Sequence, residues 1–250
     1  MPSVDELSAL YANFLIAPRH GPGVCRVCLN LTDGWRCCYA CAHGGRWLDA
    51  VAPVSYSVAG EQLHHALAGY KRAAAPVARE LALGLASILW RWLASHECCV
   101  ARAAGIDTFP LVTTVPSCDP RHARRQPLHA LVAELVAPIG DRLQQLLERS
   151  PAEVEPHRFS RERYLARQAL DGQAVLLVDD TWTTGANAQS AAAALKAAGS
   201  GPVAAVVIGR HINRGWGEND RRLRELQRPF DWGHCVLCAD RRSSQAAGAG

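Results

Sequence analysis

The stretch VLLVDDTWTTGANAQSAAAALKAAG, residues 175–199, decides the fold of this chain. It opens with an apolar run of strand length, passes through two adjacent aspartates and a Thr/Gly turn, and continues as an alanine-rich segment. Short runs of valine and leucine are typical of buried strands, whereas alanine favours a helix. We therefore expect a strand that ends at the aspartates and a helix that begins just after the turn and stops at Gly199.

Further apolar runs extend this unit into a sheet. The segment FPLVTTVPS, residues 109–117, ends at a proline, and PVAAVVIGR, residues 202–210, follows the predicted helix. The order strand, helix, strand predicts an α/β fold whose central sheet is parallel and flanked by helices. We also expect one or two short strands within residues 50–60. Helices are predicted over residues 61–72, 75–94 and 127–149, the last of them kinked or broken at Pro138.

The bulk composition is that of a globular protein. The chain has 250 residues, is 49% hydrophobic and carries a net charge of +4, which suits an anionic ligand as well as a nucleic acid. The most apolar stretch, residues 81–94, is too short to span a bilayer and contains Arg91, so we expect no membrane insertion. The first residues contain acidic side chains and no basic run, so we expect no signal peptide and a cytoplasmic protein.

Ten cysteines in a reducing compartment favour metal binding or thiols over disulfides. The segment CRVCLNLTDGWRCCYAC, residues 25–41, contains two CxxC pairs at the spacing of a four-thiolate zinc site. The first pair is Cys25 and Cys28, and the second is Cys38 and Cys41. Cys37 is an alternative to Cys38, and His43 is a substitute ligand. We predict a small structural zinc ribbon here.

A third CxxC pair, Cys235 and Cys238, lies near the end of the chain beside His234. One such pair fits either a second metal site or plain thiols, and the pattern leaves both open. The other cysteines, Cys98, Cys99 and Cys118, are interpreted as small core or surface residues.

The two aspartates of the opening stretch point to a ligand site. In open parallel sheets, ligands bind beyond the carboxyl ends of the strands, where Asp179 and Asp180 are predicted to lie. The next residues place backbone N–H groups at a helix N-terminus, which suits a phosphate. Carboxylates at this place fit sugar hydroxyls or a magnesium ion, so the pair describes a ribose 5-phosphate. In the competing interpretation Asp180 only caps the helix, which leaves the second aspartate unexplained.

The segment VLLVDDTWTTGAN, residues 175–187, resembles the phosphoribosyl-diphosphate (PRPP) signature of type I phosphoribosyltransferases. The resemblance implies the type I fold and binding of PRPP with Mg²⁺. It implies that Asp179 and Asp180 hold the ribose hydroxyls as catalytic residues, with Asp180 the better candidate for moving a proton. Asn187 stands where the signature usually has threonine. The residues implied to wrap the 5-phosphate are Thr183, Thr184, Gly185, Ala186 and Asn187.

The resemblance also implies a second phosphate cradle for the diphosphate. The turn after strand 109–117 supplies backbone groups, and basic side chains neutralise the phosphate oxygens. The residues assigned to this cradle are Val115, Pro116, Ser117, Arg121, Arg124, Arg125 and Lys71. A mobile loop before the signature strand would close over the diphosphate through Arg158, Arg161 and Arg163. The alternatives are a solvated arginine turn, a lysine at a helix C-terminus and an exposed amphipathic helix.

An N-terminal zinc ribbon joined to a PRPP-signature domain resembles the ComF family, which is linked to competence and DNA uptake. The implied organisation is a zinc ribbon at residues 1–45, a phosphoribosyltransferase-like domain at 46–230 and a tail at 231–250. The tail carries the third CxxC pair and is expected to be partly disordered in its last residues, RRSSQAAGAG. The sequence RRQPLHAL, residues 124–131, departs from the Gly-Phe-Asn-Gln-like stretch that family members often show there.

Two functions follow from the resemblance. In the first, the protein transfers the phosphoribosyl group to an unidentified acceptor, such as a nucleobase, under a hood that includes residues 209–220. Trp182 or Trp216 would stack on the acceptor, although core packing is the simpler role for both. In the second, the fold binds PRPP without catalysis or serves as a scaffold in DNA uptake. Its zinc ribbon would then contact proteins or single-stranded DNA through Trp35, Arg36 and Arg46.

Overall fold

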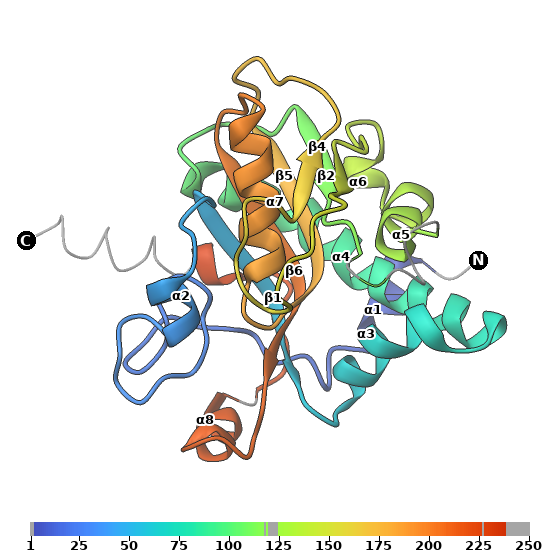
Figure 1. Cartoon of the computed structure of the whole chain (residues 1–250). Coiled ribbons are helices and arrows are strands. Elements are labelled where there is room, and N and C mark those ends of the chain that lie inside the picture. Colours follow the sequence, from blue (N-terminus) through green and yellow to red (C-terminus); the bar gives the residue numbers. More distant parts are fainter. Residues whose placement is uncertain (1–2, 118, 120–124, 227, 239–250) are drawn as a thin grey trace, which may run out of the picture.

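The computed structural model describes residues 3–117, 119, 125–226 and 228–238. Within these residues, a central sheet of four strands is parallel throughout, as the sequence predicts (Figure 1). The strand order is β1 (Ala50–Val58), β6 (Val203–Ile212), β5 (Val175–Trp182) and β2 (Leu111–Thr114). Residues 50–58 form one nine-residue strand rather than two short ones. Because all four strands run the same way, their carboxyl ends meet at one edge of the sheet.

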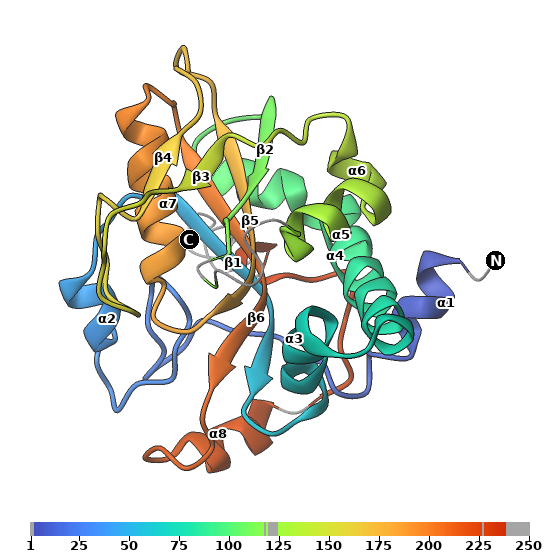
Figure 2. The same ribbon diagram turned by 45° about the vertical axis from the view of Figure 1, so that its right-hand side comes forward.

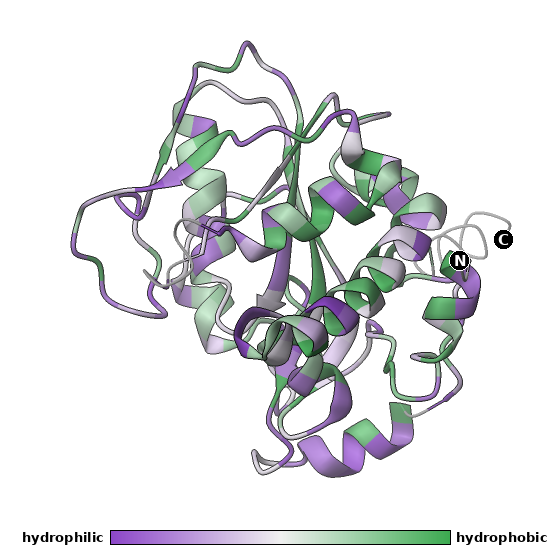
Figure 3. Ribbon diagram, turned by 90° about the vertical axis from the view of Figure 1, so that its right-hand side faces the viewer, coloured by the Kyte–Doolittle hydropathy of each residue, from purple (hydrophilic) through white to green (hydrophobic). Residues whose placement is uncertain are grey.

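Alternate side chains of each strand enter different hydrophobic cores. Leu176 and Val178 of β5 pack into one core, whereas Val175 and Leu177 pack into the other. This period of two is the geometry of a strand buried on both faces. Figure 3 shows the central strands as mostly hydrophobic, whereas the helices mix hydrophilic and hydrophobic residues. The sheet is therefore the middle layer of the molecule.

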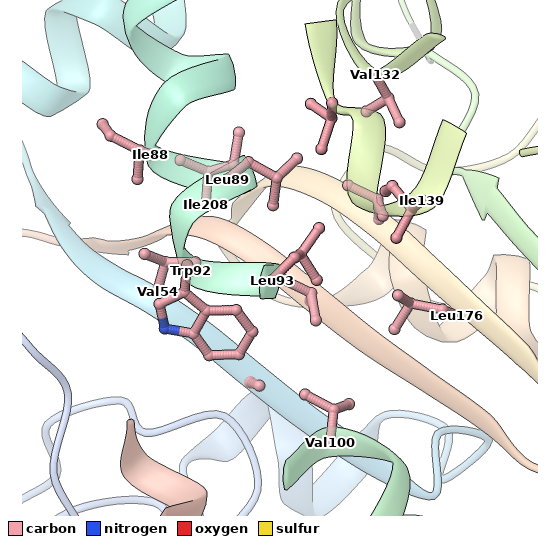
Figure 4. Packing of buried hydrophobic residues seen from close by; sticks show 14 of the residues in the cluster. Val54, Ile88, Leu89, Trp92, Leu93, Val100, Val132, Ile139, Leu176 and Ile208 are labelled. Atoms are coloured by element: carbon pink, nitrogen blue, oxygen red, sulfur yellow. The ribbon is translucent and has the colours of Figure 1, made fainter. Parts of the chain in front are cut away.

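One face of the sheet is covered by helices, and Figure 2 shows them beside β2, β5 and β6. They are α3 (Gln62–Arg72), α4 (Ala75–Ala103), α5 (Pro127–Leu135) and α6 (Ala137–Gly140). The longest, α4, packs Ile88, Leu89, Trp92 and Leu93 toward the strands (Figure 4). All of residues 84–89 are buried, so the middle of the helix is enclosed on every side, and toward its C-terminus the buried residues recur mainly at spacings of three and four, which is one helical face.

The other face is covered by helix α7 (Ala186–Ala197), a short antiparallel hairpin and the cysteine-rich segment. The hairpin pairs β3 (Leu147–Arg149) with β4 (Tyr164–Ala166). The remaining helices are α1 (Val4–Ala9), α2 (Tyr39–His43) and α8 (Asn219–Leu226). Among the described residues, no helix combines the length and apolar character needed to cross a bilayer.

The predicted helix over residues 127–149 is broken near Pro138 as expected, but it does not continue to residue 149. Helix α5 ends at Leu135, and Val136 adopts φ −119° and ψ 75° before a new turn begins as α6. Pro138 lacks the N–H that a continuous helix needs and clashes with the preceding turn, which explains the break. Residues 147–149 leave the helical pattern because they pair with residues 164–166. Helix α4, in contrast, continues nine residues beyond the predicted end at residue 94.

A buried arginine joins the cysteine-rich segment to the sheet. Arg210 of β6 is only 3% exposed. Its Nε donates to the Cys28 carbonyl at 3.1 Å, and its Nη1 donates to the carbonyls of Trp182 at 3.0 Å and His211 at 2.6 Å. The hydroxyl of Tyr56 in β1 donates to the Leu29 carbonyl at 2.7 Å. These bonds fix the segment to the carboxyl ends of β5 and β6.

We predict that Arg210→Met lowers the free energy of unfolding by about 3 kcal/mol or more, because buried carbonyl groups lose a charged donor. Urea denaturation followed by circular dichroism measures the change. Arg221 is the control, since it is exposed and its ion pairs are local, with Glu218 just before α8 and Glu225 within it. Arg221→Met is expected to change stability by no more than about 0.5 kcal/mol. Equal losses in both variants would contradict the role given to Arg210.

Candidate functional site

A pocket of about 380 Å³ opens at the carboxyl-terminal edge of the sheet. Its walls come from the ends of β2 and β5, the N-terminus of α7 and the C-terminus of α3. Segments that are more than 100 residues apart in the sequence thus meet around one space. The sequence-predicted residues that line it are Lys71, Val115, Pro116, Ser117, Asp179, Asp180, Thr183, Thr184, Gly185, Ala186 and Asn187.

The two aspartates form the floor of this pocket. Asp179 and Asp180 are only 8% and 5% exposed. Asp180 accepts a hydrogen bond from the Tyr70 hydroxyl and forms an ion pair with Lys71, both from the end of α3. Asp179 Oδ1 accepts from the Asp180 backbone N–H at 2.9 Å. Two adjacent carboxylates thus share one lysine in a largely dry environment.

This crowding changes the proton affinity of the floor. Burial and the nearby Asp180 carboxylate raise the pKa of Asp179 to about 7, while Lys71 acts in the opposite direction. Burial and the charge of Asp180 raise the pKa of Tyr70, so its hydroxyl keeps its proton and donates. Asp179 is therefore a group that can hold or release a proton near neutral pH.

The turn between β5 and α7 requires a glycine. Gly185 has φ +83°, and a Cβ atom there would lie 2.1 Å from the Trp182 ring. Only glycine combines this left-handed conformation with such a close approach. Thr184 Oγ1 donates to the His157 carbonyl at 3.0 Å and accepts from the Ala186 N–H at 3.3 Å. The N-terminus of α7 is thereby directed at the pocket, where its amides can hold an anion.

The described residues that line the pocket carry charges of both signs. Among them, the cations are Lys71 and Arg72 and the acidic side chains are Asp119, Asp179 and Asp180. Carboxylate oxygens such as those of Asp179 and Asp180 are the ligands that Mg²⁺ prefers, so this donor set is compatible with a magnesium ion.

The predicted basic residues lie in different places. Arg121 and Arg124 are outside the described residues, as is Cys118, and Arg125 is exposed. Arg158 forms an ion pair with Glu155 at 2.8 Å, and Arg161 lies over the Trp47 ring at 4.5 Å.

The third arginine of the predicted mobile loop, Arg163, is buried. Its Nη2 donates to the carbonyls of Glu155 at 2.8 Å and Arg158 at 2.7 Å. Arg163 thus binds the backbone of its own loop. Residues 155–170 consist of turns, irregular segments and β4, so the alternative of an amphipathic helix over this region is wrong.

Several site residues were not predicted. Tyr70 stands next to Lys71 in the sequence, but a tyrosine within an amphipathic helix gives no signal that separates a site from the core. His157 contributes to the pocket from the loop before β4. Of the two tryptophans considered for stacking, Trp182 is buried as core packing requires, whereas Trp216 is 72% exposed. The predicted hood segment begins as the end of β6, which runs to Ile212.

A second cavity, of about 720 Å³, lies between the cysteine-rich segment and the turn that joins β5 to α7. Cys37, Tyr39 and Arg46 line it from one side, and Trp182 and Gln189 from the other. His157, Thr184, Gly185 and Ala186 line both cavities. The turn is therefore a thin wall with a cavity on each side.

The predicted four-cysteine group assembles near the N-terminus. The Sγ atoms of Cys25, Cys28, Cys38 and Cys41 all lie within 4.8 Å of one another, and Cys28 and Cys38 are 3.6 Å apart. This resolves the choice between Cys37 and Cys38 in favour of Cys38, since Cys37 faces the larger cavity instead. Four buried thiols in this arrangement can hold a zinc-type metal ion.

A second cysteine–histidine group is present in the part of the chain that the structure describes. Its ligand atoms also lie within 4.8 Å of one another, and its members are His96, Cys99, Cys235 and Cys238. The third CxxC pair thus meets helix α4. The histidine of this group is His96, whereas His234, which lies beside the pair in sequence, has its Nδ1 2.5 Å from an Asp231 oxygen. Cys99, interpreted above as a packing residue, belongs to the group.

Comparisons with models of protein families, with curated proteins and with solved structures find no match to this chain. The geometry of the pocket and of the two cysteine groups therefore carries the functional argument.

We predict that Asp179→Asn makes the protein more stable at pH 8. Because the folded state raises the pKa of Asp179, it holds more protons than the unfolded chain between about pH 4 and 7, and stability falls as the pH rises through this window. The asparagine removes that loss. A gain of at least about 1.4 kcal/mol, the equivalent of one pKa unit, is expected at pH 8 and should shrink toward pH 4.

Urea denaturation at several pH values measures the difference in free energy of unfolding between Asp179→Asn and the wild type. Asp171, in an exposed turn, is the matched control, and Asp171→Asn should stay within about 0.5 kcal/mol of the wild type at every pH. A gap for Asp179→Asn that does not depend on pH would show that the carboxyl is ionised throughout.

Proposed function

We propose that this protein binds PRPP with Mg²⁺ in the pocket at the carboxyl ends of β2 and β5, on a type I phosphoribosyltransferase fold. The observation that carries the proposal is the meeting of two adjacent aspartates, a glycine turn at a helix N-terminus and a second strand-end turn around one space. Each part was assigned from the sequence to a different portion of PRPP, and a common pocket is what a single ligand requires.

Each part of the ligand has a partner in this assignment. The amides of residues 183–187 and the start of α7 hold the 5-phosphate, and the diol of the ribose faces Asp179 and Asp180. The turn at residues 115–117 and Lys71 serve the diphosphate. Magnesium, when bound, would add positive charge to that of Lys71 and Arg72, the cations among the described residues of the lining.

The same groups support transfer of the phosphoribosyl group to an acceptor with release of diphosphate, the reaction of a glycosyltransferase of the pentosyl class. Stabilisation of charge on the leaving group would supply most of the rate. Tyr70 and Lys71 hold Asp180, which can orient the ribose, and Asp179, with a pKa raised to about 7, can accept a proton from the acceptor once it is ionised near neutral pH. A nucleobase is one acceptor class to test.

The cysteine-rich segment next to this pocket supports the proposed likeness to the ComF family. Arg210 connects the backbone of Cys28 with the end of the signature strand at Trp182, so the metal-type cluster and the ligand turn are mechanically joined. In this proposal zinc in the four-cysteine group is structural. A role in competence follows from the likeness, and the cytoplasmic location expected from the first residues of the sequence belongs to the same proposal.

We predict that Mg-PRPP raises the melting temperature of the wild type and not that of Asp180→Asn. At about a hundred times its Kd, a ligand stabilises the folded state by about 2.7 kcal/mol. For a chain of this size that is a rise of roughly 5–10 °C, measurable by scanning fluorimetry. The variant loses the acid that faces the ribose and the partner of Lys71.

Asp171→Asn is again the control and should shift as the wild type does. Ribose 5-phosphate with magnesium should give a smaller rise, because it lacks the diphosphate. Equal shifts in wild type and Asp180→Asn, with both proteins folded before ligand is added, would remove the site assignment. Diphosphate release with a panel of nucleobases then separates a transferase from a protein that only binds PRPP.

A second candidate function is contact with single-stranded DNA through the cysteine-rich segment. Trp35 is 72% exposed and lines a shallow hollow with Arg26 and Arg36. An exposed indole beside two guanidinium groups is a combination that stacks bases and pairs with phosphates. This surface is separate from the PRPP pocket, so both functions can coexist.

We predict that Trp35→Ala weakens binding of a fluorescently labelled single strand about tenfold, since stacking of a base contributes about 1–3 kcal/mol. Fluorescence anisotropy at two salt concentrations measures the affinity, which should fall as salt rises. Trp216, also 72% exposed, is the matched control, and Trp216→Ala should bind as the wild type does. Equal losses in both variants would point to nonspecific attraction.

A further inference from the structure

The second cysteine–histidine group joins two parts of the chain that are distant in sequence. His96 and Cys99 stand three residues apart on α4, and Cys235 and Cys238 stand three residues apart in the C-terminal turn. Cys99 and Cys238 are 139 residues apart, yet their Sγ atoms are 3.2 Å apart. Neither pair could assemble a site alone, and the fold brings both to one point.

The orientation of His96 fits a metal ligand. Its Nε2 lies 2.9 Å from the carbonyl oxygen of Trp232, and its Nδ1 lies 3.5 Å from Cys238 Sγ. A carbonyl only accepts hydrogen bonds, so Nε2 carries the hydrogen and Nδ1 presents its lone pair to the sulfurs. A backbone carbonyl that fixes the outer nitrogen in this way is the usual companion of a metal-bound histidine.

The sulfur atoms are placed for a metal ion rather than for a disulfide. Cys238 Sγ is 3.2 Å from Cys99 Sγ and 3.4 Å from Cys235 Sγ. A disulfide requires about 2.05 Å, whereas two thiolates on one tetrahedral zinc ion, each about 2.3 Å from it, lie about 3.8 Å apart. His96, Cys99 and Cys235 are buried and Cys238 is partly buried.

We propose that His96 Nδ1 and the thiolates of Cys99, Cys235 and Cys238 bind a second zinc ion, which fastens the C-terminal segment to α4. Three thiolates and one imidazole are a soft donor set that suits a closed, structural zinc site. On binding, the ion displaces the thiol protons to solvent. This site is independent of the PRPP pocket and of the four-cysteine group.

The segment that this ion would hold completes the core beneath α4. Phe230 and Cys235 belong to that core, and Trp232 and Leu237 pack against it. The Trp232 ring contacts Phe230 at a centroid distance of 4.7 Å and lies 4.6 Å from the Arg91 guanidinium. A cross-link between residues so far apart in sequence greatly restricts the unfolded chain, which stabilises the native state.

The number of zinc ions per chain tests the proposal. The full-length protein, purified with zinc and without chelator, is measured by native mass spectrometry. The wild type is expected to carry two ions. Cys238→Ser should lose one ion through the C-terminal group, and Cys38→Ser should lose one through the N-terminal group. Cys98→Ser and Cys37→Ser are the matched controls, because each changes a cysteine adjacent to a proposed ligand and both should keep two ions.

X-ray absorption at the zinc edge tests the wild type without relying on any variant to fold. When both sites are occupied, the two zinc ions together have seven sulfur ligands and one imidazole nitrogen. When only the N-terminal group is occupied, all ligands are sulfur. One zinc ion per chain with only sulfur ligands would overturn the proposal. So would a disulfide that joins two of Cys99, Cys235 and Cys238 in the wild type, located by mass spectrometry of peptides digested without reduction.

Discussion

Two carboxylates buried side by side at the end of a strand are the constraint around which the carboxyl edge of this protein is organised. Asp179 and Asp180 cannot both be ionised in a dry site unless nearby groups offset their negative charges. Tyr70 and Lys71 of α3 supply a hydroxyl and an ammonium, and the raised pKa of Asp179 lets one proton remain. Such an arrangement destabilises the fold, so its presence favours a functional explanation over a structural one.

At the same edge of the sheet, hydrogen bonds connect the cysteine-rich segment to β5 and α7. Arg210 satisfies carbonyls on both sides, and the Trp47 backbone N–H donates to Gln189 of α7 at 2.8 Å. The indole of Trp182 fills the space that a side chain at residue 185 would need. The four-cysteine group, the end of β5 and the N-terminus of α7 therefore pack as one unit. Loss of the four-cysteine group would disturb the turn between β5 and α7.

The sequence predicts the elements that depend on residues close together in the chain. The apolar run before Asp179 and the alanine-rich run after Gly185 gave β5 and α7 to within a few residues, because their burial depends on their own composition. The hairpin of β3 and β4 was missed because strands of three residues carry no measurable period, and their pairing depends on a distant segment. The four-cysteine group was visible because its ligands are close in sequence. The partnership of His96 with Cys235 was not, because only the tertiary fold brings α4 to the C-terminal turn.

The position of β1 at the edge of the sheet has a consequence for biosynthesis. Among the described strands, its neighbour in the sheet is β6, about 150 residues further along the chain, and on its other side Tyr56 forms an isolated bridge with Ile16. A ribosome adding roughly 5–20 residues per second would leave this apolar strand without its partner for about 8–30 seconds. During elongation, β1 is therefore an apolar strand whose backbone groups are not yet paired with β6, and the sheet can be completed only late in translation. Folding of this protein should thus depend on whatever shields residues 50–58 until the last strand emerges.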